Sequence, residues 1–271
     1  MILAVLVAVT STIAWLVSRP SMISVGPYAL EARLRGDGRP AVVFEADLEG
    51  GFSPYQKLQN EIAAKTRTLA YERAGYGRSG SGPEAPTAEQ TARDLRALLG
   101  AAGIGAPVIL VCHGVGCLYA RVFAHAFPSQ TAGLVFVDPM TKSFYDRMKA
   151  SPAAWRKAGE ALPAAARRER AALPTTLSQA HGAWPLPQVP CVVITAMKPL
   201  GEWPFATRDD MSAWLAADEA FVARLPQVVH VVLPQATHSS MLDSSEVEQT
   251  ILRMVEQVRA EGPGTGSGAH R

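Results

Sequence analysis

Short apolar runs alternate along the chain with longer stretches of helical periodicity. The apolar runs are too short for helices and are rich in β-branched residues, which favours strands. Consecutive parallel strands need a helical crossover, and such helices cover both faces of the sheet. We therefore predict an α/β fold with a mostly parallel sheet of about eight strands. The expected strands lie at residues 41–44, 68–71, 107–111, 134–137, 191–194 and 228–233, after a hairpin at 23–25 and 29–34.

Two helix starts have the spacing of a capping box. Thr87 is followed three residues later by Gln90, and Ser245 by Glu248. In this arrangement two side chains satisfy backbone N–H groups that the first turn leaves without partners. We expect a helix to begin at each of these positions.

Residues 140–189 break the alternation, because they are rich in Ala, Pro and Arg. Ligands of open α/β sheets bind beyond the carboxyl ends of the central strands. We therefore predict that residues 140–189 form a cap inserted over that edge, with the hydrolase-like core at 21–139 and 190–261. A single core is expected for a chain of 271 residues with 48% hydrophobic content. The Gly-rich tail, 262–271, is expected to be disordered.

The N-terminus carries a possible membrane signal. Residues 1–18 contain no charged side chain, and a bilayer core needs roughly 20 apolar residues. No basic residue precedes the run and no clear cleavage motif follows it, so we predict a membrane anchor at residues 1–20 rather than a removed signal peptide. Arg19, Arg33 and Arg35 would favour the cytoplasmic side for the main domain. A soluble N-terminal helix is the alternative.

Composition excludes several functions. The net charge of +2 gives no basic signature of nucleic-acid binding. The three cysteines lie in apolar stretches and are expected to be reduced core thiols. The six histidines show no HExxH spacing and no CxxC occurs, so we expect neither a metal nor another cofactor.

Several motifs in the right order resemble those of the α/β-hydrolase superfamily, in its serine esterase and lipase branch. Residues 71–79, YERAGYGRS, are similar to the family's YDRAGYGRS turn, with Glu72 in place of aspartate. Residues 111–117, VCHGVGC, resemble its VGHSxGG nucleophile elbow. Residues 133–139, GLVFVDP, resemble its GLVLVDP strand, and Thr237-His238 its GH before the last helix. The resemblance implies the α/β-hydrolase fold with a short helical cap.

The resemblance places glycine, Gly114, at the position of the nucleophile. Members of the family carry serine, cysteine or aspartate on this strained strand-to-helix turn. Gly116 keeps the small residue two positions later, whereas Cys112 replaces the usual glycine two positions earlier. Because residue 114 has no side chain, no covalent acyl-enzyme can form there.

The same resemblance implies a base and an acid. His238, between the last strand and the last helix, matches the catalytic histidine, although a surface histidine is the alternative. Asp138 follows the strand at 134–137 and is our candidate for the carboxylate that orients His238. A purely structural role for Asp138 in the turn is the alternative.

The oxyanion site also departs from the family pattern. The backbone N–H of Val115 should be one of its donors, and the loop at residues 45–51 should supply another. Asp47 lies there where the family usually carries glycine, and a carboxylate would repel a developing oxyanion. Cys112 should point into the sheet, and Ser239 and Ser240 adjoin the base, so none is a good replacement nucleophile.

Three functions fit this sequence. The first is a nucleophile-free ligand-binding protein or pseudoenzyme, which the combined changes at Asp47, Cys112 and Gly114 favour. The second is an enzyme that uses His238 and Asp138 as a general base without a covalent intermediate. The third is a serine esterase whose nucleophile was replaced by Gly114 to trap a complex.

Residues 140–189 also suggest the kind of partner. Phe144, Tyr145, Trp155 and Trp184 favour a small apolar or amphiphilic ligand, although lid aromatics also serve as packing. The segment has eight Lys and Arg residues against three Asp and Glu residues. Such a surplus is compatible with a membrane surface or with a solvated helical face.

Overall fold

A computed structural model of the chain describes residues 19–82, 86–202, 204–225 and 228–262. The anchor expected at residues 1–20 falls almost entirely on residues 1–18, and most of the expected tail on residues 263–271; both stretches lie outside the described residues. Within the described ranges, no helix is long and apolar enough to cross a membrane.

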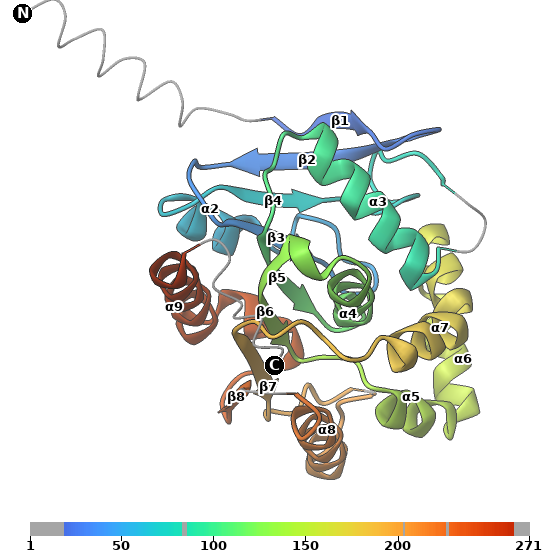
Figure 1. The fold of residues 1–271 in the computed structure, drawn as a ribbon. Helices are drawn as coiled ribbons and strands as arrows, with labels where there is room; N and C mark the ends of the chain where they lie inside the picture. The colour runs from blue at the N-terminus through green and yellow to red at the C-terminus, as the bar shows by residue number, and fades with distance from the viewer. Residues whose placement is uncertain (1–18, 83–85, 203, 226–227, 263–271) are drawn as a thin grey trace, which may run out of the picture.

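The described strands form one eight-stranded sheet in the order β1-β2-β4-β3-β5-β6-β7-β8 (Figure 1). β1 and β2 form the expected antiparallel hairpin, and β2 also pairs antiparallel with β4, whereas all pairs from β4 to β8 are parallel. The prediction of a mostly parallel α/β sheet is confirmed. The strand bounds are β1 Ser21–Ser24, β2 Ala29–Arg35, β3 Ala41–Glu45, β4 Thr68–Tyr71, β5 Val108–His113, β6 Thr131–Val137, β7 Cys191–Ala196 and β8 Val228–Leu233.

Helices cover both faces of the sheet, and each face has its own apolar core. One core includes side chains of α3 (Ala88–Ala101), α4 (Gly116–Ala126) and α8 (Arg208–Val222). The other includes side chains of α2 (Gln56–Ala63) and α9 (Ser245–Glu261). β5 contributes alternate residues to the two cores, because successive side chains of a strand point to opposite faces. This double burial explains why the strand is apolar throughout.

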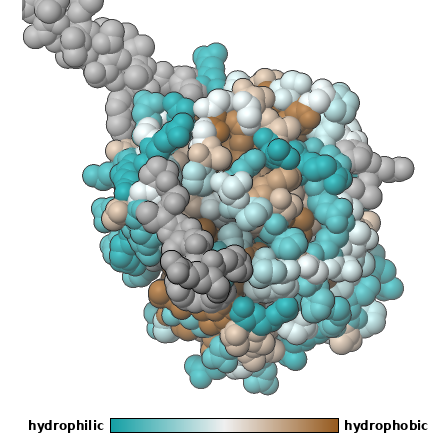
Figure 2. Space-filling view, in the orientation of Figure 1, coloured by the Kyte–Doolittle hydropathy of each residue, from teal (hydrophilic) through white to brown (hydrophobic). Residues whose placement is uncertain are grey.

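Residues 140–189 contain three helices, α5 (Lys142–Lys149), α6 (Pro152–Glu160) and α7 (Ala164–Gly182). α7 packs against α3 and α4, and its Glu169 is buried against Arg73. On the face shown in Figure 2, hydrophilic residues surround smaller hydrophobic areas.

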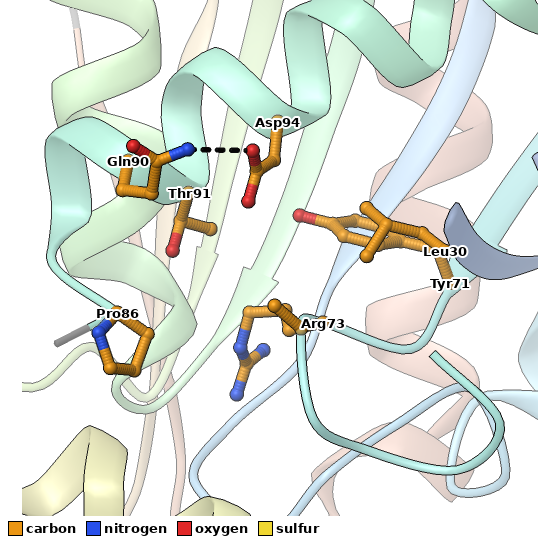
Figure 3. Close-up of a pocket in the computed structure, with 8 residues that line it drawn as sticks. Leu30, Tyr71, Arg73, Pro86, Gln90, Thr91 and Asp94 are labelled. Carbon is orange, nitrogen blue, oxygen red and sulfur yellow. Dashed lines mark hydrogen bonds between the residues drawn. The ribbon is translucent and has the colours of Figure 1, made fainter. Parts of the chain in front are cut away.

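The predictions of two capping boxes are wrong, although both helices begin at the expected positions. Thr87 is the N-cap of α3 but makes no capping hydrogen bond. Gln90 instead donates to Asp94 Oδ1 (2.8 Å), at the rim of a pocket beside Tyr71 and Arg73 (Figure 3). α9 does begin at Ser245, but the residue before it, Ser244, caps the helix by accepting the N–H of Glu246. In α3 another partner takes up Gln90, and in α9 the residue before the predicted cap makes the capping bond.

Candidate functional site

Gly114 lies at the turn between β5 and α4 in a left-handed conformation, with a φ of 51°. Its N–H donates to Val137 O (3.1 Å) and its carbonyl accepts from Met140 N–H (2.9 Å), so the turn is fixed to the end of β6. Residues other than glycine rarely adopt this φ, because it strains their backbone. A Cβ at position 114 would also overlap the carboxylate of Asp47. A side chain at position 114 would therefore require the Asp47 carboxylate to move.

Asp47 lies in the loop after β3, and its carboxylate fills the place of a residue-114 side chain. Val115 N–H donates to Asp47 Oδ1 (2.6 Å), which is the N–H that the sequence assigned to the oxyanion site. Asp47 Oδ2 lies 3.0 Å from His238 Nε2. The side chain is 24% exposed, so solvent reaches this end of the cluster.

His238 begins the short helix η2 (His238–Asp243) and lies between two carboxylates. Its Nδ1 donates to Asp138 Oδ2 at 2.7 Å, on the side opposite Asp47. Asp138 is fully buried at the end of β6, where its Oδ1 accepts from Ala196 N–H and Trp214 Nε1, both at 2.8 Å. These bonds fix the orientation of Asp138 and, through it, of the imidazole.

These contacts set the charge of His238. Burial lowers the pKa of His238, but hydrogen bonds and charge interactions with Asp138 and Asp47 outweigh it and raise the pKa to about 10. Burial raises the pKa of Asp47, but the hydrogen bond and charge of His238 bring it below its ordinary value. At neutral pH His238 is therefore a cation between two carboxylates, and it has no free lone pair with which to accept a proton.

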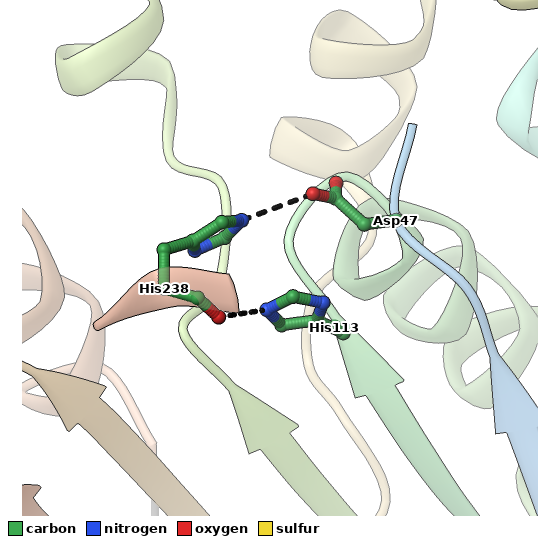
Figure 4. A group of neighbouring side chains, drawn as sticks. All are labelled: Asp47, His113 and His238. Carbon is green, nitrogen blue, oxygen red and sulfur yellow. Dashed lines mark hydrogen bonds and ion pairs between the residues drawn. The ribbon is translucent and has the colours of Figure 1, made fainter. Parts of the chain in front are cut away.

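His113, the last residue of β5, lies against His238. The two rings stack with centroids 4.4 Å apart, and His113 Nε2 lies 3.2 Å from the carbonyl oxygen of His238. Burial and then the charge of His238 lower the pKa of His113 to about 4, so its ring is neutral. One ligand atom each from Asp47, His113 and His238 lies within 4.8 Å of the others (Figure 4). Sequence spacing gave no signal for this group, because its members lie far apart in the chain.

A buried arginine holds the loop that carries Asp47. Arg73 is 3% exposed and donates to the carbonyl oxygens of Ala46 (2.6 Å) and Asp47 (2.9 Å). It also forms ion pairs with Glu45 (3.1 Å) and with Glu169 of α7 (2.6 Å). Arg73 belongs to the YERAGYGRS motif, but the motif alone gave no sign that this residue holds the Asp47 loop.

Aromatic side chains cover the other side of His238. Phe205 stacks on its ring (centroids 4.9 Å apart) and Trp214 lies edge-on (6.0 Å). Of the four aromatic residues expected near a ligand, Phe144 packs on both of them, whereas Tyr145 packs on Trp155 and Trp184 on Phe221. Phe205 and Trp214, which sequence reasoning did not select, are buried and form the apolar packing next to the imidazole.

The fold, the elbow turn and the contact between His238 and Asp138 are together typical of an α/β hydrolase. Comparison with known proteins leads to the same family. The chain belongs to the alpha/beta hydrolase family, whose sequence model matches residues 49–250. The match begins two residues after Asp47.

Three individual proteins that resemble this chain share 30% or less of its sequence in the matched regions. It is 30% identical over 105 residues to the uncharacterized protein YqjL of Bacillus subtilis, which covers 39% of this chain and 42% of that protein. The chain thus spans less than half the length of that relative. A thermophilic esterase from Thermogutta terrifontis is similar in structure with a TM-score of 0.60, 19% identity, and coverage of 89% and 99% of the two chains. The haloalkane dehalogenase DatA from Agrobacterium tumefaciens has a TM-score of 0.64, 14% identity, and coverage of 89% and 97%.

Proposed function

We propose that this protein binds a small apolar or amphiphilic ligand non-covalently and carries out no serine-hydrolase chemistry. The carboxylate of Asp47 is the observation that carries the proposal. It fills the nucleophile's place at Gly114, bonds the Val115 N–H of the oxyanion site and pairs with His238. Acyl transfer needs a nucleophile, an oxyanion donor and a free base. Here position 114 has no side chain, and Asp47 occupies both the Val115 N–H and His238. Phe205 and Trp214, both buried, make the surroundings of His238 apolar, and this apolar character supports an apolar ligand.

The test of this proposal is activity of the unmodified chain. We expect hydrolysis of p-nitrophenyl acetate no faster than that of His238→Ala, and no labelling by a fluorophosphonate probe. The physical reason is that no side chain at position 114 can form the covalent intermediate. A burst of p-nitrophenol, or a labelled residue, would contradict the proposal.

The second candidate is a general-base enzyme without a covalent step, and the 2.7 Å contact of His238 with Asp138 favours it. Against it stands the raised pKa of His238, which keeps the ring protonated. His238 becomes a base only where the charge of Asp47 is removed, for example by protonation or by a ligand that displaces it. This candidate therefore depends on the Asp47–His238 ion pair.

We expect Asp47→Asn to lower the pKa of His238 from about 10, because the ring loses one of its two carboxylate partners. Titration of His238 by nitrogen NMR measures this directly, and Asp209→Asn, an exposed change on α8, is the control. Since the folded-state pKa is raised, His238 stabilises the fold below its ordinary pKa of 6.5 and loses this contribution as pH rises towards 10. A wild-type His238 that titrates near 6.5 would contradict the ion-pair interpretation.

A membrane surface is the second proposed partner, through the basic residues of 140–189. Three of them pair with carboxylates in the structure: Lys142 with Asp146, Arg156 with Glu160 and Arg147 with Asp210. These pairs reduce the free positive charge available to anionic lipid.

We expect the chain without residues 1–20 to co-sediment more with phosphatidylserine vesicles than with neutral vesicles, and less at high salt. Lys149→Glu with Lys157→Glu should weaken this binding, because each basic residue near an anionic surface contributes about 1 kcal/mol. Equal sedimentation with both kinds of vesicle would exclude a membrane-facing cap.

A further inference from the structure

We propose that Asp47, His113 and His238 form a binding site for a divalent transition-metal ion such as Zn²⁺. Their three ligand atoms lie within 4.8 Å of one another at the carboxyl-terminal edge of the sheet (Figure 4). Two imidazole nitrogens and one carboxylate oxygen are a common ligand set for a metal ion that keeps an open position. This site goes beyond the proposed binding of an organic ligand, and its test needs no substrate.

The hydrogen bonds of the two rings leave one nitrogen of each for a metal. His238 Nδ1 donates to Asp138 Oδ2, so Nε2 is its metal-facing nitrogen. His113 Nε2 lies 3.2 Å from the carbonyl oxygen of His238, and only a donor N–H bonds a carbonyl. The lone pair of His113 is therefore on Nδ1, which Figure 4 shows on the Asp47 side of the ring.

Each of the three side chains is also held by a second partner. Val115 N–H bonds the other oxygen of Asp47 (2.6 Å) and Asp138 bonds the other nitrogen of His238 (2.7 Å). The backbone carbonyl of residue 238 holds the other nitrogen of His113. Metal ligands in proteins are oriented by such outer contacts, the carboxylate–histidine pair above all.

The ligand atoms are already close together, but the rings of His113 and His238 stack with an interplanar angle of 26°, so His113 must rotate for both lone pairs to point at one ion. Metal–nitrogen and metal–oxygen bonds of about 2.0–2.1 Å place two ligand atoms of a tetrahedral site roughly 3.3 Å apart. Asp47 Oδ2 and His238 Nε2 are now 3.0 Å apart, so this pair opens slightly while His113 moves inward. Gly114 contributes no side chain to this space. The partial exposure of Asp47 (24%) and His238 (15%) gives the ion a route from solvent.

The charges also match a divalent ion. Asp47 and Asp138 supply two negative charges around His238, and the metal replaces the proton on Nε2 that holds Asp47 and His238 together. Three protein ligands leave a fourth position of a tetrahedral ion for water or for an anionic group of a ligand.

The experiment is isothermal titration of the chelator-treated full chain with ZnCl₂, together with the visible absorption of Co²⁺ at the same site. We expect one ion per chain and the absorption bands of tetrahedral Co²⁺. Asp47→Asn and His113→Ala should each weaken binding at least ~10-fold, whereas His181→Ala, an exposed histidine on α7, should not. Asp47→Asn keeps the side-chain volume and an acceptor for Val115 N–H, so it separates loss of a ligand from loss of the fold.

Two results would overturn the metal site. One is the absence of Zn²⁺ binding by the wild-type chain. The other is unchanged affinity in a correctly folded Asp47→Asn variant, with folding checked by its melting temperature. Neither result depends on whether the chain has esterase activity.

Discussion

Gly114→Ser alone is expected to restore little esterase activity, and Gly114→Ser with Asp47→Gly considerably more. The Cβ of a serine at position 114 would overlap the carboxylate of Asp47, so the single variant must displace this side chain from its contacts with Val115 N–H and His238. Removing Asp47 clears this space, releases Val115 N–H for an oxyanion and leaves His238 with one carboxylate instead of two. Each of these changes favours acyl transfer.

The expected gain of the double variant over either single variant is about 100-fold or more in p-nitrophenyl acetate hydrolysis, since one oxyanion-site interaction is worth about 3 kcal/mol. Fluorophosphonate labelling at position 114 provides a second readout. Adding His238→Ala to the double variant should abolish the gain. If the single variant is already as fast as the double, Asp47 does not block the site, and the chain is a serine esterase whose nucleophile was replaced.

Arg73→Met is expected to destabilise the fold by about 3–5 kcal/mol, because it leaves two buried carboxylates without their cation. Glu45 and Glu169 are each 1% exposed and both pair with Arg73. Burial already raises the pKa of Glu45 to about 7, against the lowering effect of Arg73. The carbonyls of Ala46 and Asp47 would also lose their donor.

Arg78→Met is the matched control for this prediction. Arg78 follows Arg73 in the same motif and pairs with Glu31, but its side chain is 63% exposed, so its loss should cost less than about 1 kcal/mol. The free energies of unfolding in urea compare the two variants. Equal losses for Arg73→Met and Arg78→Met would show that the buried network contributes no more than a surface pair.

Features that depend on local residue patterns could be predicted, whereas features that depend on contacts between distant residues could not. The apolar runs predicted the parallel strands, because a strand buried on both faces must be apolar along its length. The capping boxes of α3 and α9 were wrong, because Gln90 bonds Asp94 and Ser244 takes over the cap. Local spacing shows which side chains can bond a helix terminus but not which other partners the fold brings within reach.

The family-like core and the glycine at the elbow turn could be predicted from residue types along the strands and at the turn after β5. The group that occupies the space beside Gly114 depends instead on how distant parts of the chain come together. Asp47, Gly114 and Asp138 follow β3, β5 and β6, which are neighbours in the sheet although they are far apart in the chain. Only this alignment places Asp47 and Asp138 on the two nitrogens of His238. The charge of the histidine follows from these distances and from burial, and no sequence motif encodes either quantity.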